Sequence, residues 1–236
     1  MCNRLINLAL RMDNAKVKPE SIKFLSLNVR GLSNFHKRRA IFSRTERQDQ
    51  WRKEWGAPVL FSHGSTNARG VAILMKNSLN ITIQQSEISL DGRFIVLKAD
   101  INNETYTIAN VYGPNKDTDA VKFYRNLSKL LRNDDFANED NIFSGRDCNC
   151  PLDISLDKKG GLPIPGKYVT NSVAELQNEF SLHDIWRLKN PTLQSFTWEG
   201  CSPFIFCRLD HWLISRATIR QRGTLPVRPL GYLELC

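Results

Sequence analysis

Short apolar segments, each closed by a polar or glycine-containing turn, recur along most of this chain and restrict it to folds rich in β-strands. The clearest pair is Phe94–Ile101 and Tyr106–Tyr112, two β-rich runs that meet across a tight polar turn, which is the pattern of a β-hairpin. Proline cannot donate to a sheet, so Gly113-Pro114 ends the second run. The other strands that we expect are Ile22–Leu27, Pro58–Ser62, Gly70–Met75, Asn141–Gly145, Phe196–Trp198 and Phe204–Ile214.

Helical features occur between these strands. Residues Thr118–Leu131 place large apolar side chains at helical spacing, whereas the basic stretch His36–Trp55 has weaker periodicity. A third helix is expected over Ser172–Phe180, in which Ser172 and Glu175 match the S-x-x-E pattern of a capping box. Many strands with a few interspersed helices predict an α/β (α+β) fold, a two-sheet β-sandwich flanked by helices.

The length of 236 residues suits one domain with a sizeable core. No apolar run approaches the ~20 residues that span a bilayer, and Leu5–Leu10 is too short and interrupted for a signal peptide. We therefore expect an intracellular protein, cytoplasmic or nuclear, with no membrane partner. The glycine- and proline-rich segment Asp153–Pro165 is expected to be a surface loop.

The net charge of +9 is concentrated toward the two ends of the chain. Residues 1–56 carry net +8, residues 57–204 net −2 and residues 205–236 net +3. Basic ends favour a polyanion such as DNA or RNA as partner. A solvated helix face with a disordered tail would produce the same charge pattern, so charge alone does not decide.

Six cysteines are present: Cys2, Cys148, Cys150, Cys201, Cys207 and Cys236. Neither close pair has the two-residue gap of a common zinc knuckle. Reduced thiols without a metal are the expected state.

Polar residues stand where several predicted strands end, and strand ends are where loops converge and a rigid scaffold can hold chemistry. They are Asn28, Tyr112 with Asn115, Asp147 with Asn149, and Asp210 with His211. Side chains two apart on a strand share a face, so alternation puts Arg208 with Asp210 and turns His211 away. Each residue also has a structural interpretation. Asn28 and Asp147 are typical turn formers, but a carboxylate in an apolar strand is costly unless paired or bound to metal.

Four ordered segments carry a resemblance that single residues do not. Leu25–Leu32, Ile108–Asn115, Asp147–Asn149 and Arg208–His211, with Gly70–Leu74 between them, resemble the successive blocks of the endonuclease/exonuclease/phosphatase superfamily. The sequences of these blocks most resemble the endonuclease domain of LINE-type (non-LTR) retrotransposons. The resemblance covers about Ser21 to Ser215. The expected organisation is an N-terminal extension (1–20), the endonuclease-like domain (21–215) and a divergent basic tail (216–236).

The resemblance implies an incomplete DNase-like two-sheet fold that hydrolyses phosphodiesters with Mg²⁺ or Mn²⁺. By resemblance, Asn28 would help to hold the metal and Tyr112 would contact the phosphate. Asp147 would position or activate water, Asn149 would stabilise phosphoryl charge, and Asp210 would orient a later histidine. Asn115 and Arg146 are expected at the substrate. The implied partner is DNA, or RNA, within a polyprotein that once included a reverse transcriptase.

Two departures from the family pattern predict an impaired, internally deleted copy. The metal-binding glutamate of the family follows its first helix, but here Ile41-Phe42 passes directly to Ser43–Trp51, and neither Glu46 nor Glu54 ends a strand. The family's final histidine is also missing, because no histidine follows Ser215. A milder departure is Arg146, which stands where the family has a glycine before Asp147.

Four functional hypotheses remain open at this stage. They are an impaired phosphodiesterase, a nucleic-acid-binding remnant without catalysis, a small-molecule phosphatase and a retroelement fragment without selected function. The near-neutral middle of the chain, which offers no dedicated basic pocket, disfavours the phosphatase. Slow metal-dependent cleavage would support the first hypothesis, and salt-sensitive binding without cleavage the second.

Overall fold

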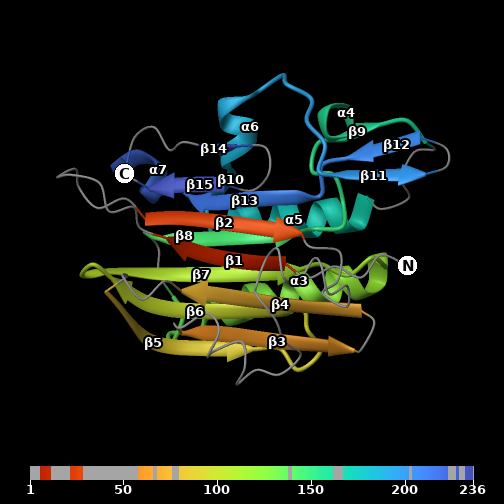
Figure 1. The fold of residues 1–236 in the computed structure, drawn as a ribbon. Helices are drawn as coiled ribbons and strands as arrows, with labels where there is room; N and C mark the ends of the chain where they lie inside the picture. Colours follow the sequence, from red (N-terminus) through yellow and green to blue (C-terminus); the bar gives the residue numbers. More distant parts are fainter. Residues whose placement is uncertain are drawn as a thin grey trace, which may run out of the picture.

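The computed structural model describes residues 6–11, 22–28, 58–65, 68–75, 80–137, 140–161, 167–201, 204–222, 227–228 and 232–235. These residues form two six-stranded sheets and one small three-stranded sheet (Figure 1). The stretch expected to be helical, His36–Trp55, lies outside the described residues, as do Glu46 and Glu54. No helix in the described part has the length and apolarity needed to cross a bilayer.

The first sheet joins strands from widely separated parts of the chain. Its order is β14 (Val227–Arg228), β15 (Tyr232–Leu235), β2 (Ile22–Asn28), β1 (Ile6–Arg11), β4 (Ala68–Met75) and β3 (Val59–Ser65). Strand β1 lies between β2 and β4, antiparallel to the first and parallel to the second. Strands β1, β14 and β15 come from the segments that we expected to flank the domain.

The second sheet contains the predicted hairpin. Its order is β10 (Leu182–Asp184), β13 (Asp210–Ser215), β8 (Ile142–Asp147), β7 (Glu104–Tyr112), β6 (Phe94–Ile101) and β5 (Ile81–Ile88). Strands β6 and β7 meet at Asn102 and Asn103, whose φ angles are 53° and 66°. Positive φ at both central residues is what a tight type I′ hairpin requires. Strand β5 was not expected, because most of its side chains are exposed and show no apolar alternation.

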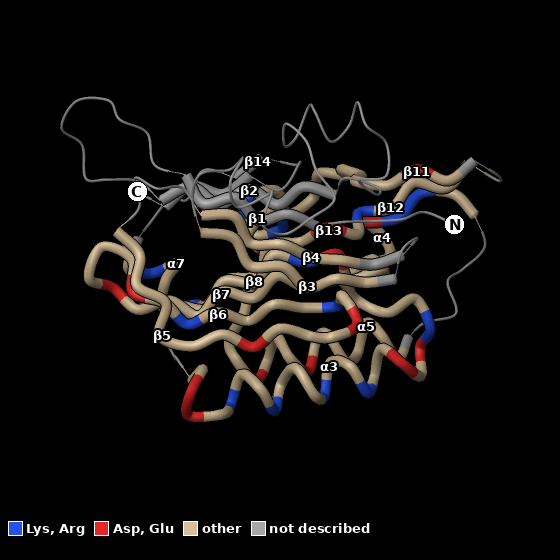
Figure 2. Tube along the Cα trace, turned by 60° about the horizontal axis from the view of Figure 1, so that its bottom comes forward, with Lys and Arg blue, Asp and Glu red and all other residues tan. Residues whose placement is uncertain are grey.

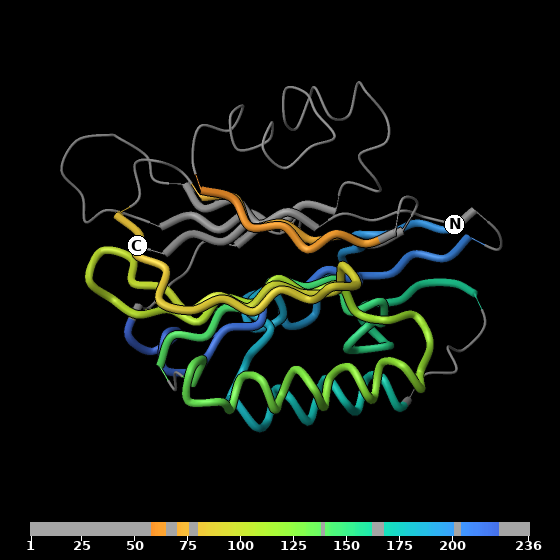
Figure 3. Tube along the Cα trace, turned by 90° about the horizontal axis from the view of Figure 1, so that it is seen from below, coloured from red at the N-terminus to blue at the C-terminus, as the bar shows by residue number. Residues whose placement is uncertain are grey.

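Two long helices cover the outer face of the second sheet. They are α3 (Asp117–Arg132) and α5 (Lys167–Glu179), and they pack against each other. Acidic and basic residues are interspersed along α3 (Figure 2). Seen from below, edge-on to the sheets, the molecule has three layers, the first sheet, the second sheet and the helices (Figure 3). One apolar core lies between the sheets and includes Ile73, Leu97 and Ile108, while a second lies beneath the helices. The predicted two-sheet sandwich flanked by helices is confirmed.

Two local predictions are wrong. Helix α5 begins at Lys167, so Ser172 lies inside it and its hydroxyl donates to the Tyr168 carbonyl at 2.9 Å instead of capping an N-terminus. The segment expected as a surface loop begins with α4 (Ile154–Asp157) and β9 (Lys158–Lys159). Strand β9 joins β12 (Phe204–Cys207) and β11 (Trp198–Cys201) in the small sheet. Two short helices, α6 (Ile185–Lys189) and α7 (Arg216–Arg222), complete the described elements.

Candidate active site

Three of the predicted site residues lie in one row across neighbouring strands of the second sheet. Tyr112 pairs with Asp147 in the parallel ladder of β7 and β8, and Asp147 pairs with Asp210 in the antiparallel ladder of β8 and β13. Residues directly opposite one another on adjacent strands project from the same face. The row therefore gathers a phenol and two carboxylates where β7 and β8 end and β13 begins.

Hydrogen bonds tie together the loops that follow β7 and β8. The Gly113 N–H donates to the Asp147 carbonyl at 2.7 Å, and Asn149 Nδ2 donates to the Gly113 carbonyl at 2.5 Å. A Cβ on Gly113 would lie 2.8 Å from the Cys148 carbonyl oxygen, so only glycine allows this approach. The Asn149 N–H donates to Asp147 Oδ1 at 2.9 Å. This is the Asx turn that the sequence also allowed, and it holds the carboxylate in place.

The row is largely closed to solvent. Tyr112 is 5% exposed and Asp147 is fully buried, whereas Asp210 is half-buried. The guanidinium of Arg93 lies 5.3 Å from the centre of the Tyr112 ring, in cation–π range, and Arg93 Nη1 donates to the Gly113 carbonyl at 3.0 Å. Sequence reasoning missed Arg93, because it precedes β6 and belongs to no recognisable motif.

The other predicted site residues do not lie in the row of Tyr112, Asp147 and Asp210. Asn28 is the last residue of β2, and β2 ends at the same end of the sandwich at which β13 begins (Figure 1). Asn115 is exposed in the loop after β7.

Arg146 is separated from the row. It is fully buried, and its Nε and Nη2 donate to the Ser144 hydroxyl at 3.2 and 2.9 Å. Arg146 and Asp147 are consecutive strand residues and project from opposite faces of the sheet.

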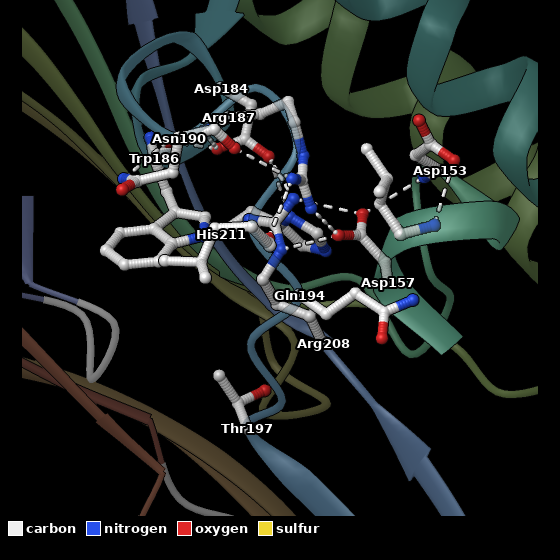
Figure 4. A network of polar contacts seen from close by, with 12 residues as sticks. Asp153, Asp157, Asp184, Trp186, Arg187, Asn190, Gln194, Thr197, Arg208 and His211 are labelled. Carbon is white, nitrogen blue, oxygen red and sulfur yellow. Dashed lines mark hydrogen bonds and ion pairs between the residues drawn. The ribbon is translucent and has the colours of Figure 1, made fainter. Parts of the chain in front are cut away.

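Beside the row, a buried network of charged side chains connects α4, α6 and the start of β13 (Figure 4). Arg208 donates from Nε to Asp157 Oδ1 at 2.8 Å and from Nη2 to Asp184 Oδ2 at 2.5 Å. Arg187 Nη2 also donates to Asp157 at 2.5 Å. Asp184 caps α6 by accepting from the Trp186 and Arg187 amides, and its Oδ2 lies 3.3 Å from His211 Nδ1.

The charges of this network shift the pKa values of its members. Burial would raise the pKa of Asp157, but hydrogen bonds and charge from Arg208 lower it below its usual range. Burial would also raise the pKa of Asp184, and His211 and Arg208 together lower it well below that range. Burial would lower the pKa of His211, whereas Cys148 and Asp184 raise it above its usual value. Opposite charges, held by specific hydrogen bonds, therefore outweigh desolvation in this network.

The network corrects one expectation about β13. Alternation along a strand predicted Arg208 on the face of Asp210, but β13 begins at Asp210, and Arg208 instead reaches Asp184, the carboxylate that His211 also contacts. The one available sequence signal was Asp184 directly before Ile185-Trp186, because aspartate is a preferred helix N-cap.

The described residues do not by themselves provide a metal site. Among them, no group of three or more His, Cys, Asp and Glu side chains is placed to hold a metal ion. Asp147 and Asp210 supply two carboxylates on neighbouring strands, and Mg²⁺ accepts oxygen ligands of this kind. The principal ligand that the resemblance implies, a glutamate, has no counterpart in the described part of the chain.

The sequence of this chain was compared with those of known proteins, and one of them is a transposon protein. The chain is 28% identical over 153 residues to the "Transposon TX1 uncharacterized 149 kDa protein" of Xenopus laevis, which covers 65% of this chain but only 11% of that protein. No family profile matches the sequence.

Solved structures resemble between 76% and 98% of the chain. The endonuclease domain of TRAS1, a telomere-specific non-LTR retrotransposon, covers 98% of this chain and 96% of its own with a TM-score of 0.55 at 10% identity. The AP endonuclease LMAP from Leishmania major covers 76% of this chain and 70% of its own with a TM-score of 0.58 at 14% identity. TDP2 from D. rerio, solved with a single-strand DNA product, covers 80% and 81% with a TM-score of 0.50 at 15% identity. The predicted resemblance is confirmed, and the chain has the fold of the endonuclease/exonuclease/phosphatase superfamily with a sequence related to a transposon protein.

Proposed function

We propose that this chain is a retrotransposon-type nucleic-acid phosphodiesterase whose rate of hydrolysis is strongly reduced. The observation that carries the proposal is the row of Tyr112, Asp147 and Asp210 across β7, β8 and β13. A carboxylate and a phenol at adjacent positions can hold a water and a phosphate oxygen within reach of each other, which is the geometric requirement for hydrolysis.

In the proposed reaction, Asp147 accepts a hydrogen bond from the attacking water and orients it toward the phosphorus. Tyr112 donates its hydroxyl to a phosphate oxygen. Mg²⁺ or Mn²⁺, when bound with the help of Asn28, would supply charge stabilisation at the phosphate. Asp210 positions whichever group protonates the leaving oxygen. Nucleic acid is the proposed substrate class, in keeping with the structural similarity to the TRAS1 endonuclease domain and the AP endonuclease LMAP.

Three features support a reduced rate. Asp147 is fully buried, so water reaches its carboxylate only when the surrounding loops open. The Asn149 amide already donates to the Gly113 carbonyl and must be released before it can contact phosphate. The segment directly after β13, residues 216–236, contains no histidine, and the loss of a general acid or base typically costs about 10²–10⁴-fold in rate.

Nicking of supercoiled plasmid, with Mg²⁺ or with a chelator, tests the proposal. We expect slow nicking that requires Mg²⁺ and is lost in Asp147→Asn. The matched control is Asp119→Asn, a carboxylate on the exposed side of α3, which leaves the rate unchanged. Nicking that persists in Asp147→Asn would reject the proposed site, and nicking as fast as in a complete relative would reject the reduced rate.

A parallel filter-binding measurement separates catalysis from binding. If the plasmid stays intact while the chain binds DNA with an affinity that falls steeply with salt, the chain is the non-catalytic binding remnant and the hydrolase proposal fails. The hydrolase proposal also fails if neither nicking nor binding is found, and the chain is then a fragment without nucleic-acid function.

A further inference from the structure

Two buried cysteines lie on the loop that follows β8, on the helix side of the second sheet. Cys148 and Cys150 are free thiols, 0% and 5% exposed, within the apolar core beneath α3 and α5. Asp147 is the last residue of β8 and projects from the face of the sheet that carries Tyr112, whereas Cys148 lies in the cluster beneath the helices. The thiols therefore share a loop with Asp147 and Asn149 without taking part in the row.

The turned backbone between the two cysteines shortens the distance between their Cα atoms relative to an extended strand. Asn149 has a φ of 52°, so the chain turns at the intervening residue instead of extending. Both cysteines belong to the same cluster of buried residues beneath the helices. A disulfide needs Cα atoms within roughly 4.4–6.8 Å of each other, a range that residues two apart reach when the residue between them is turned. The backbone at this turn is therefore compatible with a bridge between the pair.

The charges of Arg146 and of protonated His211 favour the thiolate of Cys148. Arg146 and His211 are buried, and Nη1 of the first and Nε2 of the second have no hydrogen-bond partner among the described residues. Burial alone would raise the pKa of Cys148, but the hydrogen bond from Cys150 and the charges of His211 and Arg146 lower it below its usual range. The pKa of Cys150 is raised, first by its hydrogen bond to Cys148 and then by burial.

We propose that Cys148 and Cys150 form a reversible modification site, at which a low-molecular-weight disulfide such as oxidised glutathione converts the two thiols into an intramolecular disulfide. Cys148 is the attacking group, because the thiolate is the nucleophile in thiol–disulfide exchange. Cys150 is the resolving group. The proposal does not depend on the proposed hydrolase function.

The exchange proceeds in two balanced steps. The Cys148 thiolate attacks one sulfur of glutathione disulfide, an S–S bond forms to Cys148, and one glutathione leaves as thiolate. The Cys150 sulfur then attacks Cys148, and the second glutathione leaves. The protein loses two electrons and two protons, one proton held on His211 and one on Cys150, and the reagent becomes two glutathione thiols. Because both cysteines are buried, the reaction proceeds through local opening of the loop.

Mass spectrometry of tryptic peptides from the intact, folded chain tests the proposal. Cleavage after Arg146 and Lys158 gives the peptide Asp147–Lys158, which contains these two cysteines and no other. After treatment with oxidised glutathione and trapping of remaining thiols, this peptide should lose two hydrogen atoms and escape labelling at both cysteines. The internal control is the peptide Asn190–Arg208, which holds Cys201 and Cys207. These two are not opposite each other in the β11–β12 ladder and should stay reduced.

Two variants assign the roles. Cys150→Ser should accumulate a single glutathione adduct on Cys148, whereas Cys148→Ser should form no adduct on Cys150. Circular dichroism shows whether each variant is folded, and the wild-type peptide measurement stands even if one is not. The proposal is overturned if Asp147–Lys158 keeps both thiols in the oxidant, if both control cysteines are oxidised to the same extent, or if Cys148→Ser forms an adduct on Cys150 as readily as Cys150→Ser does on Cys148.

Discussion

Two charged clusters meet at the start of β13. One pairs carboxylates with cations, and the other places two carboxylates opposite each other. In the ion network, Arg208 lies between Asp157 and Asp184, and each carboxylate has a cation within hydrogen-bond distance. In the row at the strand ends, Asp210 lies directly opposite Asp147, carboxylate against carboxylate. Only two positions separate the two arrangements along the chain.

The difference separates residues that hold the fold from residues that are available for chemistry. Carboxylates paired with cations inside the protein offset their desolvation only through good geometry, and removing one partner leaves a buried charge uncompensated. Like charges directly opposite in a sheet are destabilising, and groups placed this way are candidates for a functional role. We therefore expect substitutions in the network to lower stability, and substitutions in the row to alter activity with little loss of stability.

The largest expected effect is that of Arg208→Ala. The substitution removes the partner shared by Asp157 and Asp184, whose side chains are 0% and 9% exposed. Breaking a buried ion pair in this way should lower the free energy of unfolding by about 3–5 kcal/mol, as measured by urea denaturation. Arg132→Ala is the matched control, because Arg132 pairs with Glu179 at the surface with 62% of its side chain exposed. Its expected cost is about 1 kcal/mol or less, and equal losses in the two variants would break the comparison.

Local signals in the sequence were enough to predict the row but not the network. Tyr112 and Asp147 each end a short apolar strand, and the hairpin at Asn102-Asn103 follows from residues that adopt positive φ. The contact between Asp157 and Arg208 joins residues 51 positions apart. Nothing near either residue encodes its partner, so such contacts follow only from the assembled fold.

The strand order of the first sheet could not be predicted from local sequence for the same reason. Strand β1 pairs with β2 and with β4, which begins at Ala68, and the order of these strands depends on long-range pairing that periodicity does not record. Strand β5 was missed for a different reason, because it lies at the edge of its sheet and most of its side chains are exposed. Hydrophobic alternation marks a strand only where one face is buried.

A smaller effect is expected at Thr197, which links the two clusters. Its hydroxyl accepts hydrogen bonds from the Leu209 and Asp210 amides at 3.0 and 3.2 Å. Thr197→Val keeps the shape but leaves two amides without this acceptor, so the free energy of unfolding should fall by about 1–3 kcal/mol. Thr197→Ser keeps the hydroxyl and should recover most of the loss. If serine is as destabilising as valine, packing of the methyl group and not hydrogen bonding anchors the start of β13.

Asp210→Asn tests the like-charge arrangement directly and should have the opposite sign. Relief of repulsion with Asp147 is expected to raise the free energy of unfolding by about 0.2–1 kcal/mol. The slow nicking proposed above should decrease in the same variant. A loss of stability would mean that the contacts of Asp210 outweigh its repulsion from Asp147, and the row would then resemble the network.

The smallest effect is a change in how stability depends on pH, and it distinguishes the members of the network. The pKa values of Asp157 and Asp184 are lowered, so their stabilisation is complete above the unfolded-state value of about 3.9 and is lost as the pH falls toward the folded values. The pKa of His211 is raised by Cys148 and Asp184 against burial and the charge of Arg208. Its stabilisation is therefore complete below about pH 6.5 and is lost as the pH rises through the folded pKa.

Unfolding measured across this range should show declining stability at both ends, and His211→Gln should remove the alkaline decline while leaving the acidic one. An alkaline decline that survives in His211→Gln would show that His211 is neutral in the folded protein and that Arg208 alone neutralises Asp184.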